Sequence, residues 1–313
     1  IKKTEMGNSW IIFQKLLVLF GFMLLGTLGY KRRWISDEGA SQISRLIVNI
    51  FNPALIVTGI TSSEGAYSWT SVLMNILLAV ILFASLIVIS PLFVRILRVK
   101  KNVRNMYSVM LIFSNLGFMG IPLIEALYGR TAVFYVGMYT LVFNILFYTY
   151  GFYLFEKEKT SGKVRFQWKK LINPGVFACL VSLMIFSLQL EVPKTAADFL
   201  DYLGGAAVRV CMMMTGVSRA KMSLKDVFSE WKMYPFTFLK MLVIPAAAAL
   251  IIHKFQVDPV LAGIMILMYG MPNGSMPVML AVDYGMDSSL CSRGIVLTTL
   301  LSLITLPAVT CLI

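Results

Sequence analysis

Two groups of helix-breaking residues lie inside long apolar runs of this sequence. The first group lies in the stretch SNLGFMGIPLIEALYG and the second in YGMPNGSMPVMLAVDYG. Glycine, asparagine and proline each weaken or interrupt the backbone hydrogen bonds of a helix. The residues concerned are Asn115, Gly117, Gly120 and Pro122 in the first run, and Gly270, Pro272, Asn273, Gly274, Ser275 and Pro277 in the second.

Residues of these types, placed within apolar runs, indicate anion binding. The first amide groups of a restarted helix have no intrahelical partner and carry partial positive charge. Broken backbone survives in hydrocarbon only where protein or a watery cavity satisfies its polar groups. Two restarted helices that point into one cavity would therefore suit a negatively charged solute. The alternative is that both runs are ordinary proline kinks, which membrane helices tolerate.

Catalytic and metal-binding patterns are not indicated. His253 is the only histidine, and it stands beside Lys254 at the end of an apolar run, which favours an interfacial anchor. The four cysteines all lie within apolar runs and lack CxxC spacing, so neither a disulfide framework nor a zinc site is expected. We predict that the chain is not an enzyme and that it has no catalytic residues, no cofactor and no metal site.

The composition indicates a polytopic membrane protein. Hydrophobic residues make up 58% of the 313 residues and charged residues only 14%, and the mean hydropathy is +0.79. A soluble chain of this length would carry far more surface charge. The net charge of +13 is spread over short segments between apolar runs. Membrane topology therefore explains the basic residues better than nucleic-acid binding does.

The apolar runs predict about ten transmembrane helices, each about 20 residues long. The predicted spans are 10–30, 41–61, 71–96, 105–128, 132–155, 172–189, 196–218, 233–252, 259–283 and 290–312. Basic clusters fall in the odd-numbered connections, whereas the even-numbered ones hold only Arg130, Lys194 and Lys254. This bias predicts that the protein lies in the cytoplasmic membrane, with the odd connections on the cytoplasmic side and both termini on the outer side.

The long polar connection at 156–170 leaves equal numbers of spans on either side. An odd number of spans per half means that the halves, 1–155 and 171–313, have opposite orientations. Weak internal echoes support a repeat: NPALIVTGI in the second span is matched by MMMTGV in the seventh, and EALYG by AVDYG after the two interrupted runs. The predicted fold is all-α, with two inverted five-helix repeats and the fourth and ninth helices broken at matching positions.

The sequence also resembles the auxin efflux carrier family, which includes bacterial malonate and malate carriers and the plant PIN-FORMED auxin exporters. The resemblance runs through LGTLGYKRRWIS, RLIVNIFNPALIVTGI, SNLGFMGIPL, TGVSRAKM, MPNGSMPVMLAVDYG and TTLLSLITLP. It implies a fold like that of sodium/proton antiporters and bile-acid carriers. Spans 1, 2, 6 and 7 would form a scaffold and homodimer interface, and spans 3–5 and 8–10 an elevator-like transport domain. Asn115 would contact a substrate carboxylate, with MPNGS facing it.

Further site residues come from the second span and from charges within spans. Asn52, in NPALIVTGI, joins the expected substrate-binding residues. Arg209 and Arg219 depart from the family's pattern, and Arg209 could grip a dicarboxylate or pair with an aspartate of its own helix. Lys240 is a candidate for coupling, for substrate charge or for a structural pair with Glu125 or Asp283. These two acidic residues are the other coupling candidates, for protons or sodium.

The sequence therefore predicts a secondary transporter of small organic anions, mono- or dicarboxylates resembling malate, malonate or auxin, embedded in a lipid bilayer. One alternative is a cation/proton antiporter of the same fold, which would need an acidic pair where the runs are interrupted. Another is a non-transporting sensor that binds the same class of ligand. An intramembrane enzyme lacks both a metal motif and a catalytic dyad.

Overall fold

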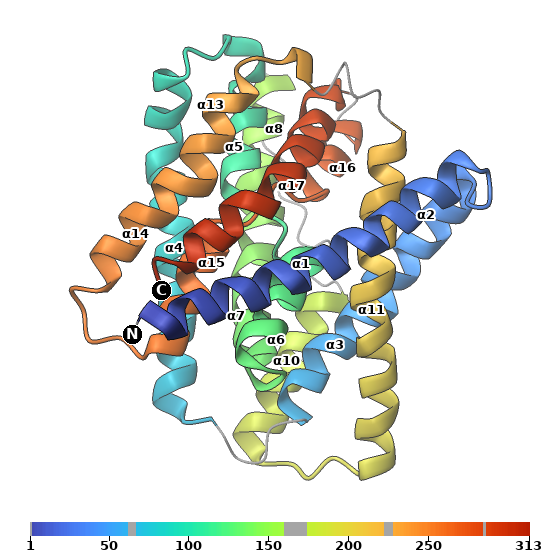
Figure 1. Cartoon of the computed structure of the whole chain (residues 1–313), viewed down its shortest axis with the longest axis vertical. Helices are drawn as coiled ribbons and strands as arrows, with labels where there is room; N and C mark the ends of the chain where they lie inside the picture. Colours follow the sequence, from blue (N-terminus) through green and yellow to red (C-terminus); the bar gives the residue numbers. More distant parts are fainter. Residues whose placement is uncertain (1, 62–66, 160–173, 222–227, 284–285) are drawn as a thin grey trace. The chain divides into compact units, whose positions relative to one another are not determined.

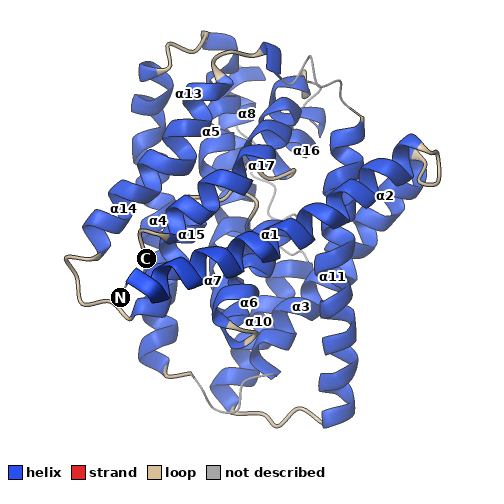
Figure 2. Ribbon diagram, in the orientation of Figure 1, coloured by secondary structure: helices blue, strands red, loops and turns tan. Residues whose placement is uncertain are grey.

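The part of the chain that the computed structural model describes consists of helices joined by loops and turns (Figure 2). The described residues are 2–61, 67–159, 174–221, 228–283 and 286–313, and within them there is no β-strand. Side chains are described for the same ranges except at 2–13, 15–16, 118, 156–159, 279–280 and 282–283. The expectation of an all-α chain is confirmed for these residues.

Each predicted span contains at least one described helix, and the chain divides into two compact units. Unit 1 comprises 1–75, 117–141 and 172–223, and unit 2 comprises 76–116, 142–171 and 224–313. The helices and π-helical turns that lie mainly in unit 1 are α1 (Lys2–Lys31), α2 (Asp37–Leu46), η1 (Ile47–Phe51), α3 (Asn52–Thr61), η3 (Leu116–Gly120), α6 (Ile121–Tyr128), α7 (Thr131–Leu146), α10 (Pro174–Leu188) and α11 (Lys194–Ala220) (Figure 1).

Unit 2 holds most of the remaining elements. They are α4 (Trp69–Ile96), the 3₁₀ turn η2 (Lys101–Val103), α5 (Arg104–Ile112), η4 (Phe147–Gly151), α8 (Phe152–Lys159), α13 (Met233–Phe238), η5 (Leu239–Val243), α14 (Ile244–Ile252), α15 (Pro259–Tyr269), α16 (Met276–Asp283) and α17 (Ser289–Thr310). The π-helical turns η1, η4 and η5 each continue directly into a neighbouring α-helix, so three of the apolar runs are helical but not regular.

Five of the described helical stretches are long and apolar enough to cross a membrane. They are Asp37–Thr61, Trp69–Ile96, Thr131–Phe155, Met233–Ile252 and Ser289–Thr310. Leu17–Lys31, Pro174–Leu188 and Pro259–Tyr269 are shorter apolar helices. The number of crossings and the inverted repeat stay predictions.

Unit 1 is held together by close helix packing on α11. A Cβ added to Gly26 would overlap the backbone of Met213, and one added to Gly216 would overlap the backbone of Met23. The Thr27 hydroxyl donates to the Gly216 carbonyl at 3.0 Å, so α1 and α11 touch through their backbones. Such contact between small residues is a common way for membrane helices to associate.

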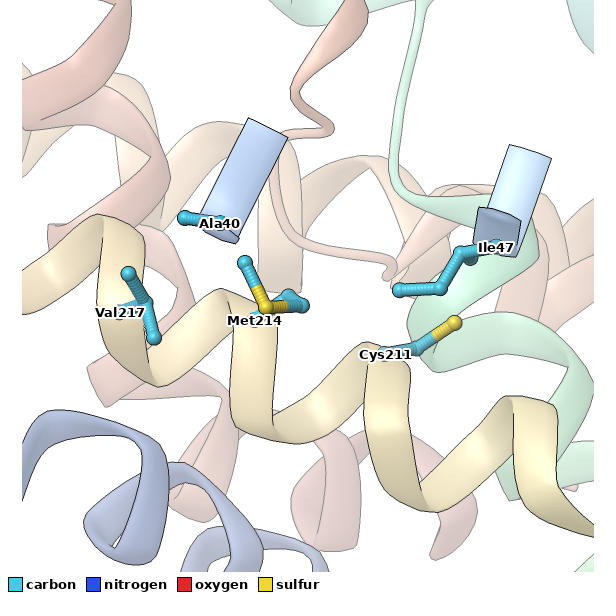
Figure 3. Close-up of a cluster of buried hydrophobic side chains, with 5 residues drawn as sticks. All are labelled: Ala40, Ile47, Cys211, Met214 and Val217. Atoms are coloured by element: carbon cyan, nitrogen blue, oxygen red, sulfur yellow. The ribbon is translucent and has the colours of Figure 1, made fainter. Parts of the chain in front are cut away.

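A second contact in unit 1 packs α2 and η1 against another face of the same segment of α11 (Figure 3). Its buried side chains are Ala40, Ile47, Cys211, Met214 and Val217. On α11 these positions recur three or four residues apart, the spacing of one helix face. The same helix therefore carries an apolar face for α2 and a small-residue face for α1.

Unit 2 is built on helices that are buried all round. Met106 to Ile112 of α5 and Leu261 to Tyr269 of α15 are buried at every position. The long helix α17 packs against both, and also against α13, η5 and α16. By contrast, α4 exposes large apolar side chains such as Leu77, Val88 and Leu92. In a chain with spanning helices, an exposed apolar face of this kind contacts lipid.

Candidate substrate-binding site

Both apolar runs with clustered helix breakers are interrupted in the structure. Helix α5 ends at Ile112, and helical geometry resumes at Leu116. Helix α15 ends at Tyr269, and α16 begins only at Met276. Asn115 therefore lies in the first interruption, and Gly270, Pro272, Asn273, Gly274 and Ser275 lie in the second.

The other breakers lie in the helices that follow the interruptions. Gly117 and Gly120 belong to the π-helical turn η3, and Pro122 lies in the first turn of α6. Pro277 likewise lies at the start of α16. Pro277 costs no hydrogen bond, because an amide in the first turn of a helix has no intrahelical partner. Pro122 instead follows directly on η3, so its missing amide weakens a continuous helical stretch. These four residues thus shape the restarted helices and not the gaps.

The two interruptions cross each other. Ser114 and Asn273 form an isolated antiparallel β-bridge, and the Asn115 amide donates to the Pro272 carbonyl at 2.8 Å. Gly274 permits this approach, since a Cβ there would lie 3.2 Å from the Ser114 carbonyl oxygen. The crossing thereby satisfies part of the backbone that the breaks leave unpaired.

Lys240 lies buried beside the crossing, within the π-helical turn η5, and is 1% exposed. Its Nζ donates to the Met110 carbonyl and to Asn273 Oδ1, both at 2.5 Å. Met110 lies in the last turn of α5, where carbonyl groups carry partial negative charge. The ammonium group therefore offsets the negative end of a broken helix and connects it to the crossing.

The contact with Lys240 determines how the Asn273 amide is oriented. An ammonium group can only donate, so the amide oxygen must face it and the Nδ2 group must point elsewhere. Asn273 is 0% exposed, and its Nδ2 has no hydrogen-bond partner among the described residues. Its backbone amide donates to Thr298 Oγ1 at 3.0 Å. The crossing thus contains a buried amide with two unused donor hydrogens.

Asn52 and Arg209, expected to bind substrate, belong to unit 1. Asn52 Oδ1 accepts a weak hydrogen bond from the Cys211 thiol at 3.8 Å, and a Cβ on Gly117 would lie 3.8 Å from Asn52 Nδ2. Arg209 is exposed, and its Nη1 donates to the Gly205 carbonyl of its own helix at 2.7 Å. The pairing of Arg209 with an aspartate of its helix is not seen.

The acidic coupling candidates are differently placed. Glu125 Oε1 lies 3.3 Å from Arg130 Nε, and Arg130 also pairs with Asp201, so Glu125 does not hold Lys240. The side chain of Asp283 lies outside the described residues. Within the described part of the chain, there is no group of three or more His, Cys, Asp or Glu residues that could hold a metal ion.

Comparison with known proteins identifies the family of the chain. A family model described as membrane transport protein matches residues 11–310. The chain belongs to this family. The resemblance to auxin efflux carriers found in the sequence is thereby confirmed. An uncharacterized transporter from Methanothermobacter thermautotrophicus is 26% identical over 306 residues, which cover 96% of this chain and 97% of the relative.

A second relative, an uncharacterized transporter from Methanocaldococcus jannaschii, is 22% identical over 280 residues, or 86% of this chain and 88% of the relative. Family and relatives together identify an integral, multi-pass membrane transporter that carries a substrate.

The sequence singled out Lys240, Asn115 and Asn273, but not Met110 or Thr298. Thr298 carried a weak signal, because a polar residue in a long apolar run needs a buried partner.

Proposed function

We propose that this transporter carries small organic anions, mono- or dicarboxylates of the malate, malonate or auxin type, as a secondary transporter. The observation that carries the proposal is the crossing of Ser114 and Asn115 with Pro272 and Asn273, with Lys240 bound to it. A carboxylate needs donors and positive potential. The crossing offers both in a place from which bulk water is excluded.

The positive potential and the donors come from backbone and side chain. Two helical segments restart next to the crossing, at Leu116 and Met276, and the start of a helix carries partial positive charge. The Leu116 and Val278 amides already donate to the Ser114 and Ser275 carbonyls, so these starts contribute mainly positive potential. Asn273 Nδ2 adds two unused donor hydrogens. The opposite, negative end of α5 is offset by Lys240. A carboxylate oxygen near Asn273 would satisfy a buried donor that the described residues leave unmatched.

The proposed architecture is two inverted five-helix repeats. Packing within unit 1 supports it: α1 of the first half contacts α11 of the second, α10 of the second half contacts α3 of the first, and α3 and α11 contact each other. An inverted repeat requires this reciprocal pattern. Spans 1, 2, 6 and 7 would be the scaffold of a homodimer, and the remaining spans would move in an elevator-like cycle. Both termini would lie on the outer side of the cytoplasmic membrane.

For coupling we favour Lys240 over the acidic candidates. The ammonium group of Lys240 is buried and has only neutral described partners. It could bind these partners when the site is empty and the charge of the substrate when the site is occupied. Glu125 is already paired with Arg130. The coupling ion is identified by measuring the transport rate with a proton gradient and with a sodium gradient, since the gradient of the coupled ion should raise the rate.

The test is counterflow of radiolabelled malate and malonate in proteoliposomes. The unaltered protein should exchange at least one of them, and Asn273→Leu should lower the rate by tenfold or more because it removes the unmatched donors. Asn49→Ala is the matched control, since Asn49 is exposed and bonds only within its helix segment. An Arg209→Ala protein with unchanged apparent affinity would remove Arg209 from the binding site.

Two outcomes would refute the proposal. Sodium-driven flux without anion exchange would assign the chain to cation antiport. Binding of malate or malonate, seen as a rise in the unfolding temperature but without counterflow, would indicate a sensor.

A further inference from the structure

A second basic site lies in unit 2, where α4 ends, α5 begins and η4 runs into α8. A cavity of about 650 Å³ opens between these elements. Its lining includes Arg95 from α4, then Arg104, Asn105 and Ser108 from α5, and Tyr150 and Tyr153 from η4 and α8. None of these residues takes part in the crossing. The volume is that of a ligand site and not of a packing defect.

The two arginines present unused donors to this cavity. Arg104 Nε donates to the Val99 carbonyl at 3.2 Å, which holds the guanidinium at the start of α5. Neither Arg104 nor Arg95 forms an ion pair with a carboxylate of the described side chains. Asn105 is also fixed, because its Nδ2 donates to the Leu154 carbonyl at 2.8 Å. Two guanidinium groups without acidic partners among the described side chains favour an anion with several oxygens, for which a phosphate is well suited.

An apolar stripe leads away from the arginines along α4. Val88, Leu92 and Ile96 are 76%, 58% and 60% exposed and lie four residues apart, on one side of the helix and next to Arg95. Opposite, the rings of Tyr150 and Tyr153 stack with centroids 6.2 Å apart. Tyrosines beside basic residues are typical of the level at which lipid headgroups lie. Arg95 lines the cavity and also adjoins this stripe, so a ligand held by Arg95 could reach the apolar surface.

We propose that this cavity binds an anionic phospholipid, with its phosphate held by Arg95 and Arg104 and an acyl chain lying along the exposed stripe of α4. Lys100 and Lys101, both exposed in the adjoining connection, add positive potential at the mouth. The predicted topology places this connection on the cytoplasmic side, where anionic lipid is available to it. A soluble phosphate could use the arginines but not the stripe.

The test uses the purified full chain in neutral detergent, with short-chain phosphatidylglycerol as the probe. Binding should raise the unfolding temperature in a saturable way, because a ligand of the folded state stabilises it. Arg95→Gln and Arg104→Gln should each weaken apparent affinity by about tenfold, the loss expected for one charge-assisted contact. Arg95→Lys should retain part of the affinity. Lys254→Gln removes the same charge from the connection between α14 and α15, which does not line the cavity, and should change the apparent affinity less than twofold.

Equal weakening by Lys254→Gln, or no weakening by Arg95→Gln, would overturn the proposal. Short-chain phosphatidylcholine that binds as tightly as phosphatidylglycerol would also overturn it, since no anionic site would then be needed. Inorganic phosphate is the second arm: competition at the same concentration as the lipid would assign the cavity to a soluble anion. Should Arg104→Gln fail to fold, Arg95→Gln still decides, because the Arg95 side chain makes no hydrogen bond or ion pair with a described residue, and its backbone is unchanged by the substitution.

Discussion

The contact between Lys240 and Asn273 allows a quantitative test of the crossing. Lys240→Met keeps a long side chain but removes the ammonium group, and Asn273→Leu removes the amide at similar volume. The two groups are buried, and Nζ lies 2.5 Å from Oδ1. A hydrogen bond to a charged group contributes about 1.5–3 kcal/mol. We therefore expect the two substitutions to be coupled by about 1.5–3 kcal/mol in the free energy of unfolding.

Neither single substitution is diagnostic. Lys240→Met leaves the Met110 carbonyl and Asn273 Oδ1 buried without their donor, at a cost of about 1–3 kcal/mol each. Removing a buried charge relieves a desolvation penalty of several kcal/mol, so the two effects oppose each other. The double-mutant cycle isolates the interaction between the two side chains. The effects of each single substitution cancel when the free energy changes of the two single variants are subtracted from that of the double variant.

The assay is reversible unfolding in mixed micelles, followed by circular dichroism, for the unaltered protein, both single variants and the double variant. A control cycle pairs Lys240→Met with Ser85→Ala. Ser85 bonds to Tyr269 at 2.6 Å and shares no described partner with Lys240, so this cycle should be additive within about 0.5 kcal/mol. A coupling below about 0.5 kcal/mol between Lys240 and Asn273 would refute the contact and, with it, our account of the amide orientation.

Three further outcomes are expected. Gly26→Ala should lower the thermal unfolding temperature strongly, because its Cβ would overlap a backbone carbonyl of α11, whereas Gly21→Ala, with nothing within 4 Å, should not. A membrane-impermeant maleimide should label exposed Cys311 in intact cells if the C-terminus lies outside, and no labelling would reverse the predicted orientation. Asp201→Asn should lower the free energy of unfolding by less than about 1 kcal/mol, with a smaller effect at high salt, because its ion pair with Arg130 is partly exposed.

The interruptions could be predicted from sequence because their cause is local. A run containing Gly270, Pro272, Asn273 and Gly274 loses hydrogen bonds and conformational restriction whatever surrounds it. The same rule extended the first break too far, over Gly117 and Pro122, which the structure places in helical turns. The local composition predicts that a helix is weakened in this region, but tertiary contacts determine which residues leave the helical conformation.

The surroundings of Lys240 could not be predicted in this way. Its two partners lie 130 and 33 residues away along the chain, and both are neutral acceptors. A sequence displays formal charges, so it directed attention to Glu125 and Asp283 as partners. The partial charge at the end of α5 exists only once the helix has formed and stopped there. The π-helical turn that carries Lys240 has no distinctive composition either.

The orientation of one amide is our reason for proposing that the crossing binds anions and not cations. A cation would need acceptor oxygens, and the side-chain oxygen of Asn273 is already taken by Lys240. Asn273 then offers only its Nδ2 group, which can only donate, and two helices begin nearby with their partly positive ends. Lys240 therefore acts twice: it occupies the acceptor that a cation would use, and its positive charge raises the potential felt by a carboxylate. A cation antiporter built on this crossing would first have to lose that lysine or gain a carboxylate beside it.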